Sequence, residues 1–504
     1  MVASDLPLLL KAWLLAPFLG AFLAAVLPSL ARVLLLLSSL ATALVGLSQL
    51  LGAPTVVLEL LGQLGVELSI DRLSGWFLLL NALILSAVLV DGWAAPQTIP
   101  RRMLLLVLQG GLNVAFVATD LVSLYVTLEL VGICAFLLIV LPQREATLWV
   151  GLRYLLVGNT AMSLFLIGAA LVYVQRESFR LEALSDLAFG APQVFLLIGL
   201  FTKAGLFAAG LWLPRTHAEA PSEVSALLSG VVVAAGVAPL LRLADIDPML
   251  LHSIRWVGAA SAVLGVSYAL VASDAKRLLA WSTLSQMGLV VLSPLSGGAM
   301  ALGHGLAKAA LFLSARRFPS RQLLQSQWRS QPVPLTTQAA LWIGSISIAG
   351  LPPLAGFAAK KQLTAALPDP WASVVLLVSM GTVAVYARFW PLLLPANPPP
   401  LRPQAVPVPQ QLAQPTQERL AVALLLLPLT IGGIAATALE LSWASLFSTA
   451  LAFAGGLLLH RGSGSIRQVA GLSLPGIERM EQLLGGMVVL GAGLLATATW
   501  SFDR

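Results

Sequence analysis

Charged side chains are scarce in this 504-residue chain. Asp, Glu, Lys and Arg make up 10% of the residues, against about 25% in an ordinary soluble domain, whereas 58% are hydrophobic. A soluble fold needs more polar surface to face water, and a disordered chain has few apolar residues, so both classes are excluded. The mean hydropathy of +0.91 predicts an integral membrane protein.

Cysteine and histidine are almost absent as well. The single cysteine, Cys134, cannot form an internal disulfide, and one thiolate makes neither a thiolate zinc site nor an iron–sulfur cluster. Four histidines are too few for a multi-haem protein, and the sequence has no glycine-rich phosphate loop or dinucleotide fingerprint. Basic residues are scattered singly or in pairs, which is typical of membrane topology. The sequence therefore predicts no cofactor, no metal, no catalytic residue and no nucleic-acid partner.

Long apolar segments fill most of the chain. Each is close to the ~20 residues that a helix needs to cross a bilayer, and none has the alternation of a transmembrane β-strand. These segments predict an all-α polytopic membrane protein with 14–16 transmembrane helices. The sixteen approximate ranges are 8–27, 33–52, 74–91, 102–119, 121–141, 150–174, 193–213, 221–243, 254–272, 278–295, 298–315, 336–366, 371–390, 419–438, 441–459 and 483–500.

The order of these segments suggests five parts. Residues 1–100 hold three N-terminal helices, and residues 419–504 hold the C-terminal helices. Residues 101–243 and 254–390 are expected to form two inverted five-helix repeats, because the fourth member of each set carries a break beside a lysine. Between them and the C-terminal part, a segment with nine prolines from Pro391 to Pro415 predicts an extended linker over 391–418.

Four ionisable side chains fall in the middle of the predicted membrane helices. They are Glu129, Lys203, Lys308 and Lys360, and His304 lies one turn from Lys308. An unpaired charge in mid-membrane costs about 2.5–3.5 kcal/mol, so four would cost about 10–14 kcal/mol, comparable with the whole stability of a protein. Such groups must pair, become neutral or face water. A row of them along a hydrated mid-plane predicts a proton relay, and the alternative is a static buried Glu–Lys pair.

Two of these helices contain features that interrupt a helix. Pro214 follows Lys203, and Pro352 and Pro353 precede Lys360. Interrupted membrane helices often line a cavity and expose backbone groups to an ion. A simple proline kink is the alternative explanation of the same pattern.

Several stretches of the chain resemble the proton-conducting antiporter-like family of membrane subunits. This family comprises the Mrp-type cation/proton antiporter subunits and the large membrane subunits of respiratory and photosynthetic complex I. The resemblance implies two inverted repeats, two broken helices and a place in a hetero-oligomeric membrane assembly. The stretches run in family order from about residue 110 to 365: DLVSLYVTLEL, RYLLVGNTAMSLFLIG, FTKAGLFAAGLWLPRTHAEAPSEVSALLSG, DAKRLLAWSTLSQMG, HGLAKAALFL and GLPPLAGFAAK.

The resemblance implies roles for individual residues. Glu129 resembles the family's paired glutamate, and Lys203 resembles the lysine of the first broken helix. Lys308, with His304 beside it, resembles the central lysine of the second repeat. Lys360 takes the place of the lysine or glutamate of the second broken helix, and a lysine there favours the Mrp D-subunit type.

Two further positions bear on a proton path. Ala234 stands where the family usually has a lysine, so the path from Lys203 to Lys308 lacks one titratable group, which water or Ser229 would have to replace. His217, in the loop LPRTHAEAP, is expected at the cytoplasmic mouth. There it either accepts protons or caps the next helix.

Together these observations predict a proton-translocating subunit of a multi-subunit cation (sodium)/proton antiporter, with no enzyme activity of its own. The alternative is a proton-pumping membrane subunit of an NAD(P)H- or ferredoxin-quinone oxidoreductase, whose redox chemistry lies in other chains. A third hypothesis, motivated by Ala234, is a non-conducting scaffold. The expected partners are other membrane subunits, protons, sodium as the candidate coupled cation, and the lipid bilayer. The expected location is a bacterial plasma or thylakoid membrane.

Overall fold

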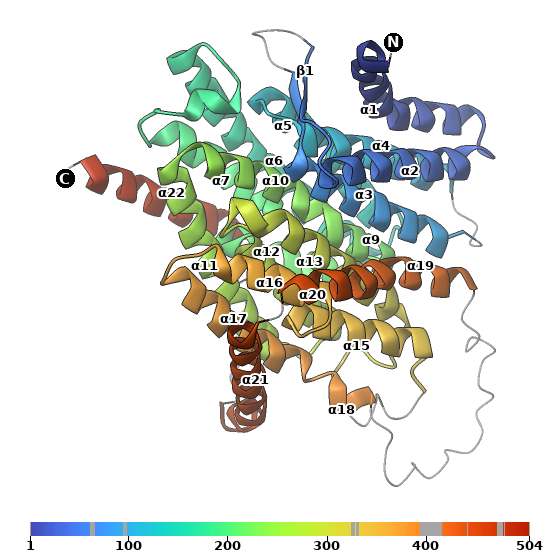
Figure 1. Cartoon of the computed structure of the whole chain (residues 1–504), viewed down its shortest axis with the longest axis vertical. Helices are drawn as coiled ribbons and strands as arrows, with labels where there is room; N and C mark the ends of the chain where they lie inside the picture. The colour runs from blue at the N-terminus through green and yellow to red at the C-terminus, as the bar shows by residue number, and fades with distance from the viewer. Residues whose placement is uncertain are drawn as a thin grey trace.

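The computed structural model describes residues 2–60, 66–93, 98–323, 328, 332–393, 416–440, 442–470, 477 and 479–502. Helices make up most of this part of the chain (Figure 1), which confirms the predicted all-α polytopic class. One antiparallel hairpin, β1 (Val56–Glu59) and β2 (Glu67–Ile70), is the exception among the described residues. Most of the predicted proline-rich linker, residues 394–415, lies outside the described residues.

The helices follow the order of the sixteen predicted apolar segments, each of which coincides with a helix or with consecutive helices. The first half contains α1 (Val2–Val26), α2 (Ala31–Leu50), α3 (Arg72–Asp91), α4 (Ile99–Val117), α5 (Leu121–Val140), α6 (Glu145–Arg176), α7 (Ala191–Ala204), η3 (Phe207–Gly210), α8 (Leu213–Glu219), α9 (Ser222–Leu227), η4 (Leu228–Val232) and α10 (Val233–Ile246). The second half contains α11 (Pro248–Val271), α12 (Ala275–Val290), α13 (Pro294–Ser314), η5 (Ala315–Arg317), α15 (Leu335–Ala349), α16 (Ala355–Ala365), α17 (Trp371–Tyr386), α18 (Trp390–Leu393), α19 (Thr416–Leu427), η7 (Pro428–Gly432), α20 (Gly433–Glu440), α21 (Trp443–Ala470) and α22 (Met480–Phe502).

Fewer of these helices pass as membrane spans than the sequence predicted. Twelve described helices are long and apolar enough to cross a bilayer, or thirteen if the bent pair of α7 with η3 and α8 is one span, against the predicted 14–16. The shortfall comes from α4, α12 and the α15–α16 pair, which are shorter or more polar. In α12 every residue except Arg277 is buried, so other helices rather than lipid surround it and it needs no long apolar face.

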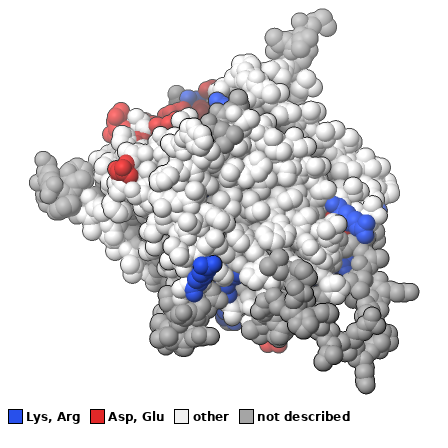
Figure 2. All heavy atoms as spheres, turned by 60° about the horizontal axis from the view of Figure 1, so that its bottom comes forward, with Lys and Arg blue, Asp and Glu red and all other residues white. Residues whose placement is uncertain are grey.

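The inner helices form a buried centre, and the outer helices expose apolar side chains of the kind that contact lipid. The most apolar stretch of the α9–η4–α10 segment is fully buried and that of α13 is 83% buried, whereas those of α1 and α2 are only 39% and 33% buried. The exposed surfaces of these outer helices are rich in leucine. Figure 2 shows a broad face of the molecule with few charged side chains, as expected for a surface that meets acyl chains.

Ion pairs fasten the β-hairpin to one end of the helical bundle. Asp71, which caps α3, pairs with Arg242 of α10 at 2.6 Å. Glu67 in β2 pairs with Arg180 at 2.9 Å, and its backbone N–H donates to Asp120, which caps α5. The hairpin thereby links α3, α5 and α10, and it marks one end of the molecule, called below the hairpin end.

The Asp71–Arg242 pair should make the hairpin end sensitive to acid. Burial alone would raise the pKa of Asp71, but Arg242 and hydrogen bonds from Ser74 outweigh burial and hold this pKa below its ordinary value. A carboxylate with a depressed pKa stabilises the folded state above its unfolded pKa, and that contribution is lost as the pH falls through the folded pKa. We therefore expect Asp71→Asn to lower the thermal unfolding temperature at pH 7, and this difference to shrink below about pH 4.

The measurement is thermal unfolding in detergent at both pH values. Glu177→Gln, at an exposed carboxylate that follows α6, is the matched control and should change little at either pH. A difference between wild type and Asp71→Asn that stays constant down to pH 3 would contradict this role of the carboxylate.

Candidate functional site

The two helix breaks lie at glycines. Gly205, directly after α7, has φ of +68°, and Gly350, directly after α15, has φ of +79°. Glycine adopts such left-handed angles without the steric cost of a Cβ. The breaks were expected from prolines, but Pro214 lies in the first turn of α8, and Pro352 lies in the turn between α15 and α16. The prolines therefore start or precede the second half of each broken helix, and the glycines end the first half.

An ion pair lies at the first break. The Nζ atom of Lys203, in the last turn of α7, lies 3.2 Å from Oε1 of Glu129 in α5. Asn159 of α6, with its amide nitrogen facing the acceptors, donates to Oε2 of Glu129 at 3.2 Å. The ammonium group lies against Gly132 and Gly158, where a Cβ would lie 2.8 Å and 3.5 Å from Nζ. Missing side chains at these two positions leave the space that the lysine head occupies.

This pair occupies a place that suits a positive charge. The last carbonyl groups of a helix carry partial negative charge, so a lysine in the last turn of α7 is stabilised. Trp212, which precedes α8, donates its indole N–H at 2.9 Å to the carbonyl of Thr202, which also accepts the backbone N–H of Gly205. Glu129 and Lys203 were expected from the sequence, but Asn159 was not, although it is an amide residue within the apolar segment of α6.

Lys308 is completely buried in α13 and has no carboxylate partner among the described residues. Its Nζ atom donates to the carbonyl of Leu279 in α12 at 2.5 Å and lies 5.6 Å from the centre of the Tyr386 ring. The tyrosine hydroxyl is itself within hydrogen-bonding distance, 2.9 Å, of Ser282. A charged amine held only by a carbonyl and an aromatic face is poorly compensated, so this group can readily give up its proton.

Hydroxyl groups extend from Lys308 toward the helix that carries Ala234. Thr283 donates to the carbonyl of Leu279, the same acceptor that Lys308 uses, at 3.1 Å. Ser229, in the π-helical turn η4, lies 2.7 Å from the Thr283 hydroxyl. π-Turns within helices often occur at functional sites. Ser229, the expected substitute for the missing lysine, is thus hydrogen-bonded to Thr283, and Thr283 and Lys308 share the Leu279 carbonyl as acceptor.

The far side of this helix faces Lys203. Val232 and Ala235, on turns that follow Ser229, line a small pocket around the Lys203 side chain. Gly236 approaches α7 so closely that a Cβ would lie 2.3 Å from the backbone N of Ala204. The η4–α10 segment therefore separates Lys203 from the Ser229–Thr283 row, and no hydrogen bond among the described residues joins Lys203 to Lys308.

His217 does not lie in an exposed loop, which corrects the expectation from sequence. It is in α8, is fully buried, and its Nδ1 lies 2.9 Å from the carbonyl of Leu213. The ring packs between Trp212 and Phe312, with centroid distances of 6.2 Å and 5.6 Å. Its Nε2 has no hydrogen-bond partner in the described part of the chain. His217 is therefore an internal group and not a side chain at an open mouth.

Lys276 is a further buried amine, beyond the residues expected from the sequence. It lies in the first turn of α12, is 8% exposed, and donates to the carbonyl of Ala220 at 2.6 Å. It is close enough to His217 to act on it electrostatically, as Lys308 is. Burial of Lys276 was hard to recognise from the sequence, because a lysine at a helix end usually faces water.

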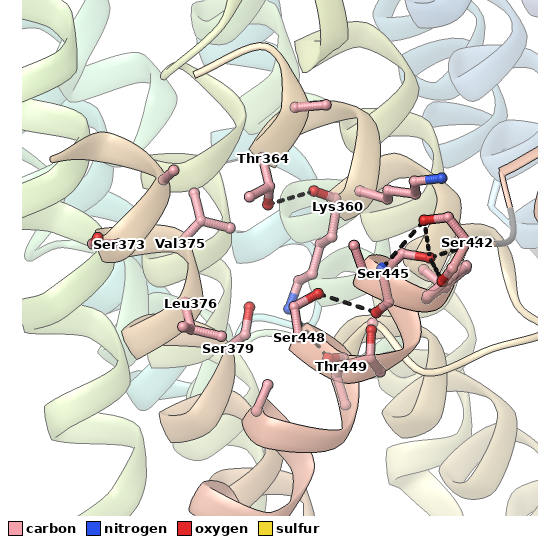
Figure 3. A pocket seen from close by; sticks show the side chains of 18 of the residues that line it. Lys360, Thr364, Ser373, Val375, Leu376, Ser379, Ser442, Ser445, Ser448 and Thr449 are labelled. Atoms are coloured by element: carbon pink, nitrogen blue, oxygen red, sulfur yellow. Dashed lines mark hydrogen bonds between the residues drawn. The ribbon is translucent and has the colours of Figure 1, made fainter. Parts of the chain in front are cut away.

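Lys360 lies in α16, just beyond the second break (Figure 3). Its Nζ donates to the carbonyl of Ala349 at 3.4 Å, one of the groups left free where α15 ends. The lysine stem passes beside Gly350, where a Cβ would lie 2.6 Å from Cδ. Neither ring nitrogen of His304 has a hydrogen-bond partner among the described residues, and both Lys308 and Lys360 act on its ring electrostatically. His304 is therefore close enough to both lysines to interact with them electrostatically.

The expected residues thus fall into three groups: the Glu129–Lys203 pair, Lys308 with His304, and Lys360. Lys308, His304 and Lys360 are buried, whereas the Glu129–Lys203 pair is partly exposed, with 20% and 10% of the two side chains accessible. Each group contains an amine that can carry or release a proton. The structure brings Glu129 to Lys203 directly and places His304 within electrostatic reach of Lys308 and Lys360. This arrangement suits proton transfer along the middle of the membrane.

Comparisons with known proteins agree with this arrangement. Residues 118–385, more than half of the chain, match the family described as NADH:quinone oxidoreductase/Mrp antiporter, TM. The chain is 30% identical to NADH-quinone oxidoreductase subunit N of Desulforudis audaxviator in an alignment of 362 positions that covers 64% of this chain and 71% of the relative. It is 27% identical to a subunit of the Na(+)/H(+) antiporter of Alkalihalophilus pseudofirmus over 306 residues, 56% and 62% of the two chains.

A solved structure has the same fold. A chain of the Mrp complex from Dietzia is 23% identical, with a TM-score of 0.73, and the match covers 98% of this chain and 60% of that chain. The family match includes all three groups, from Glu129 to Lys360, and therefore covers the whole candidate site. This chain belongs to the NADH:quinone oxidoreductase/Mrp antiporter transmembrane family, as its sequence resemblance predicted.

Proposed function

We propose that this chain translocates protons as one subunit of a multi-subunit cation (sodium)/proton antiporter. The observation that carries the proposal is the Glu129–Lys203 ion pair at a helix break inside the bundle. Lys308 and Lys360 support it, because both are buried and donate to carbonyl groups rather than to carboxylates. Buried charges that a structure needs only for stability are normally paired, so unpaired amines favour a role in conduction.

In the proposed mechanism, the Glu129–Lys203 pair controls the first proton. While the pair is closed, the carboxylate stabilises the ammonium form of Lys203. When the two groups separate, the charged amine loses its partner in a medium of low dielectric constant and releases its proton to water. Water beside the Ser229 and Thr283 hydroxyls would carry the proton on to the neutral amine of Lys308, in place of the lysine that Ala234 replaces.

From Lys308 the proton would continue through His304 to Lys360. An imidazole accepts a proton on one nitrogen and releases one from the other, so a buried histidine within electrostatic reach of both amines suits this step. Residues 101–243 and 254–390 are proposed to form two inverted five-helix repeats, each with one broken helix. We place the chain in a bacterial plasma or thylakoid membrane, beside other membrane subunits, because relatives include subunits of such assemblies.

The second candidate function is proton pumping in a quinone-reducing assembly. The relative from Desulforudis audaxviator favours it, because the similarity covers more of both chains than the similarity to the antiporter relative from Alkalihalophilus pseudofirmus. The lysine at position 360, where a glutamate would fit the quinone-distal complex I type, favours the antiporter. Both candidate functions use the same proton relay. They differ in the energy source, which is a cation gradient for the antiporter and electron transfer to a quinone for the alternative.

The two candidates separate in one experiment on the gently solubilised native assembly. Reconstituted vesicles with an internal pH dye receive either a sodium gradient or a quinone with its electron donor. Proton movement with sodium, in an assembly without flavin or iron–sulfur subunits, supports the antiporter. Proton movement that requires the electron donor supports the quinone-linked alternative, and no proton movement under either condition would contradict both.

The hydroxyl row gives a further prediction. Thr283→Val keeps the shape of the side chain but removes the hydrogen bonds to Ser229 and to the Leu279 carbonyl. We expect proton transport by the reconstituted assembly to slow about tenfold, the factor that corresponds to about 1.4 kcal/mol for one lost hydrogen bond in the path. Thr160→Val, at an exposed hydroxyl of α6 that bonds only its own helix, is the control. Equal rates in the two variants would exclude this row from the path.

A further inference from the structure

Two arginines that have no carboxylate partner lie together at one edge of the bundle. Arg32 is the second residue of α2, and Arg102 lies in the first turn of α4. The two side chains are close enough to act on one another electrostatically. The guanidinium group of Arg32 lies 5.3 Å from the centre of the Trp93 ring, and Arg102 donates to the carbonyl of Pro28 at 3.3 Å. Neither arginine forms an ion pair within the part of the chain that the structure describes.

Two carboxylates at this end of the bundle pair with other arginines. Asp91, the last residue of α3, pairs with Arg316. Glu223, in the first turn of α9, pairs with Arg101 at 3.1 Å. Residues 94–97, which connect α3 to α4 in the sequence, read AAPQ and contain no acidic residue. Two adjacent guanidinium groups that the described chain does not neutralise suit an anion, and above all a phosphate group, whose oxygens accept their paired hydrogen bonds.

The arginine pair lies at the end of the bundle opposite to the hairpin end. The chain enters the β-hairpin after α2 and leaves it into α3, so the start of α2 and the end of α3 are far from the hairpin. The arginines at this opposite end include Arg32, Arg101, Arg102, Arg144, Arg316 and Arg317. The cytoplasmic ends of membrane helices carry an excess of arginine and lysine, and the cytoplasmic leaflet contains anionic lipids. We therefore expect the arginine pair at the level of lipid headgroups on the cytoplasmic side.

An apolar stripe extends from the arginine pair along α2. Its side chains are three or four residues apart and therefore lie on one face of the helix, and each is 42–60% exposed. They are Leu30, Val33, Leu37, Leu40 and Leu44. Both α1 and α2 lie at the outside of the bundle (Figure 1). A lipid acyl chain can cover this stripe while its headgroup meets the arginines, whereas a free phosphate ion would leave the stripe uncovered.

Buried polar side chains hold the four helices around the arginine pair in fixed positions. Trp13 of α1 donates to the hydroxyl of Thr42 in α2 at 3.1 Å, and Asn113 of α4 donates to the same hydroxyl at 2.9 Å. Asn81 of α3 donates to Asn113 at 2.8 Å. Thr42, Asn81 and Asn113 are completely buried. The surroundings of the arginine pair are therefore preformed, and replacement of one arginine should leave the fold intact.

We propose that Arg32 and Arg102 bind the phosphate group of an anionic phospholipid, and that an acyl chain of this lipid lies along the apolar stripe of α2. The phosphate group then joins the start of α2 to the start of α4. A zwitterionic lipid fits less well, because its choline or ethanolamine group brings a positive charge close to the two arginines. The site lies outside residues 118–385, which match the family, and it does not depend on the proposed function.

Lipid binding is measured on the gently solubilised native assembly after detergent exchange has removed its lipids. The assembly is titrated with phosphatidylglycerol, or with phosphatidylcholine of the same acyl chains, and native mass spectrometry counts the bound lipids. We expect the wild type to bind phosphatidylglycerol more tightly than phosphatidylcholine. Arg32→Gln and Arg102→Gln should each weaken the binding of phosphatidylglycerol about fivefold, the usual contribution of one basic residue near anionic lipid, and leave that of phosphatidylcholine unchanged.

Arg176→Gln is the matched control, because it removes the same charge from an exposed arginine at the hairpin end and should bind phosphatidylglycerol as the wild type does. Arg32→Lys keeps the charge and should bind more tightly than Arg32→Gln. Equal binding by Arg32→Gln, Arg102→Gln and Arg176→Gln would overturn the site. Competition by millimolar inorganic phosphate would also overturn it, because the ligand would then be a free anion. Loss of another subunit from the Arg32 and Arg102 variants with unchanged lipid binding would overturn it in favour of a neighbouring protein chain.

Discussion

Lys203→Met is expected to lower proton transport by the reconstituted assembly at least about tenfold. The substitution removes the amine that pairs with Glu129 at 3.2 Å and leaves a carboxylate without its partner inside the bundle. Loss of one partner of a buried pair typically costs about 3–5 kcal/mol if the remaining group stays charged, so this carboxylate should become protonated. Transport is measured as the rate of internal pH change in vesicles at equal protein content.

The double variant Glu129→Gln with Lys203→Met separates conduction from stability. It replaces the pair by neutral groups of similar size, so folding should recover while transport stays low. Lys11→Met, in the outer helix α1, makes the same chemical change away from the relay and should leave transport unchanged. Full transport by the double variant would favour the hypothesis of a non-conducting scaffold, in which Glu129 and Lys203 are a static structural pair.

Gly356→Ala is expected to have the largest effect on folding. A Cβ at this position in α16 would lie 1.8 Å from the carbonyl oxygen of Ser347 in α15, a distance that only backbone movement can relieve. Overpacking of this kind typically costs about 1–3 kcal/mol and sometimes more. Because the clash lies between the two halves of the second broken helix, we expect little folded protein in the membrane and a lowered unfolding temperature.

Gly485→Ala is the matched control for this substitution. No heavy atom outside its own helix α22 lies within 4 Å of a Cβ at this position, and alanine favours a helix by about 1 kcal/mol over glycine. Folded yield should therefore be unchanged or improved. Equal yields of the two variants, measured by size-exclusion chromatography in detergent, would show that the α15–α16 contact is looser than described.

Local patterns in the sequence were enough to find the membrane helices and most of the candidate site. Apolar length is a property of one segment, so every predicted span coincides with a helix or with consecutive helices. A charged residue within an apolar segment is equally visible without a structure, which is why Glu129, Lys203, Lys308 and Lys360 stood out. Family motifs around these residues supplied the fold and the expectation of two broken helices.

The positions of the breaks and the surroundings of single side chains could not be predicted in this way. Proline is the strongest helix breaker in a sequence, yet the first halves end at Gly205 and Gly350, where the backbone turns left-handed. His217 looked like a loop residue because its neighbours are polar, but Trp212 and Phe312 enclose it.

The sequence by itself determined that this is a polytopic α-helical membrane protein with ionisable groups at mid-membrane, because hydrophobic length and isolated charges are local features. Only the tertiary structure decided which of these groups meet. The Glu129–Lys203 contact joins α5 to α7, the Ser229–Thr283 hydrogen bond joins η4 to α12, and α21 reaches Lys360 from beyond the proline-rich segment. Such contacts depend on how helices that are distant in the sequence pack against one another. The spacing of residues along one helix does not indicate which other helices pack against it.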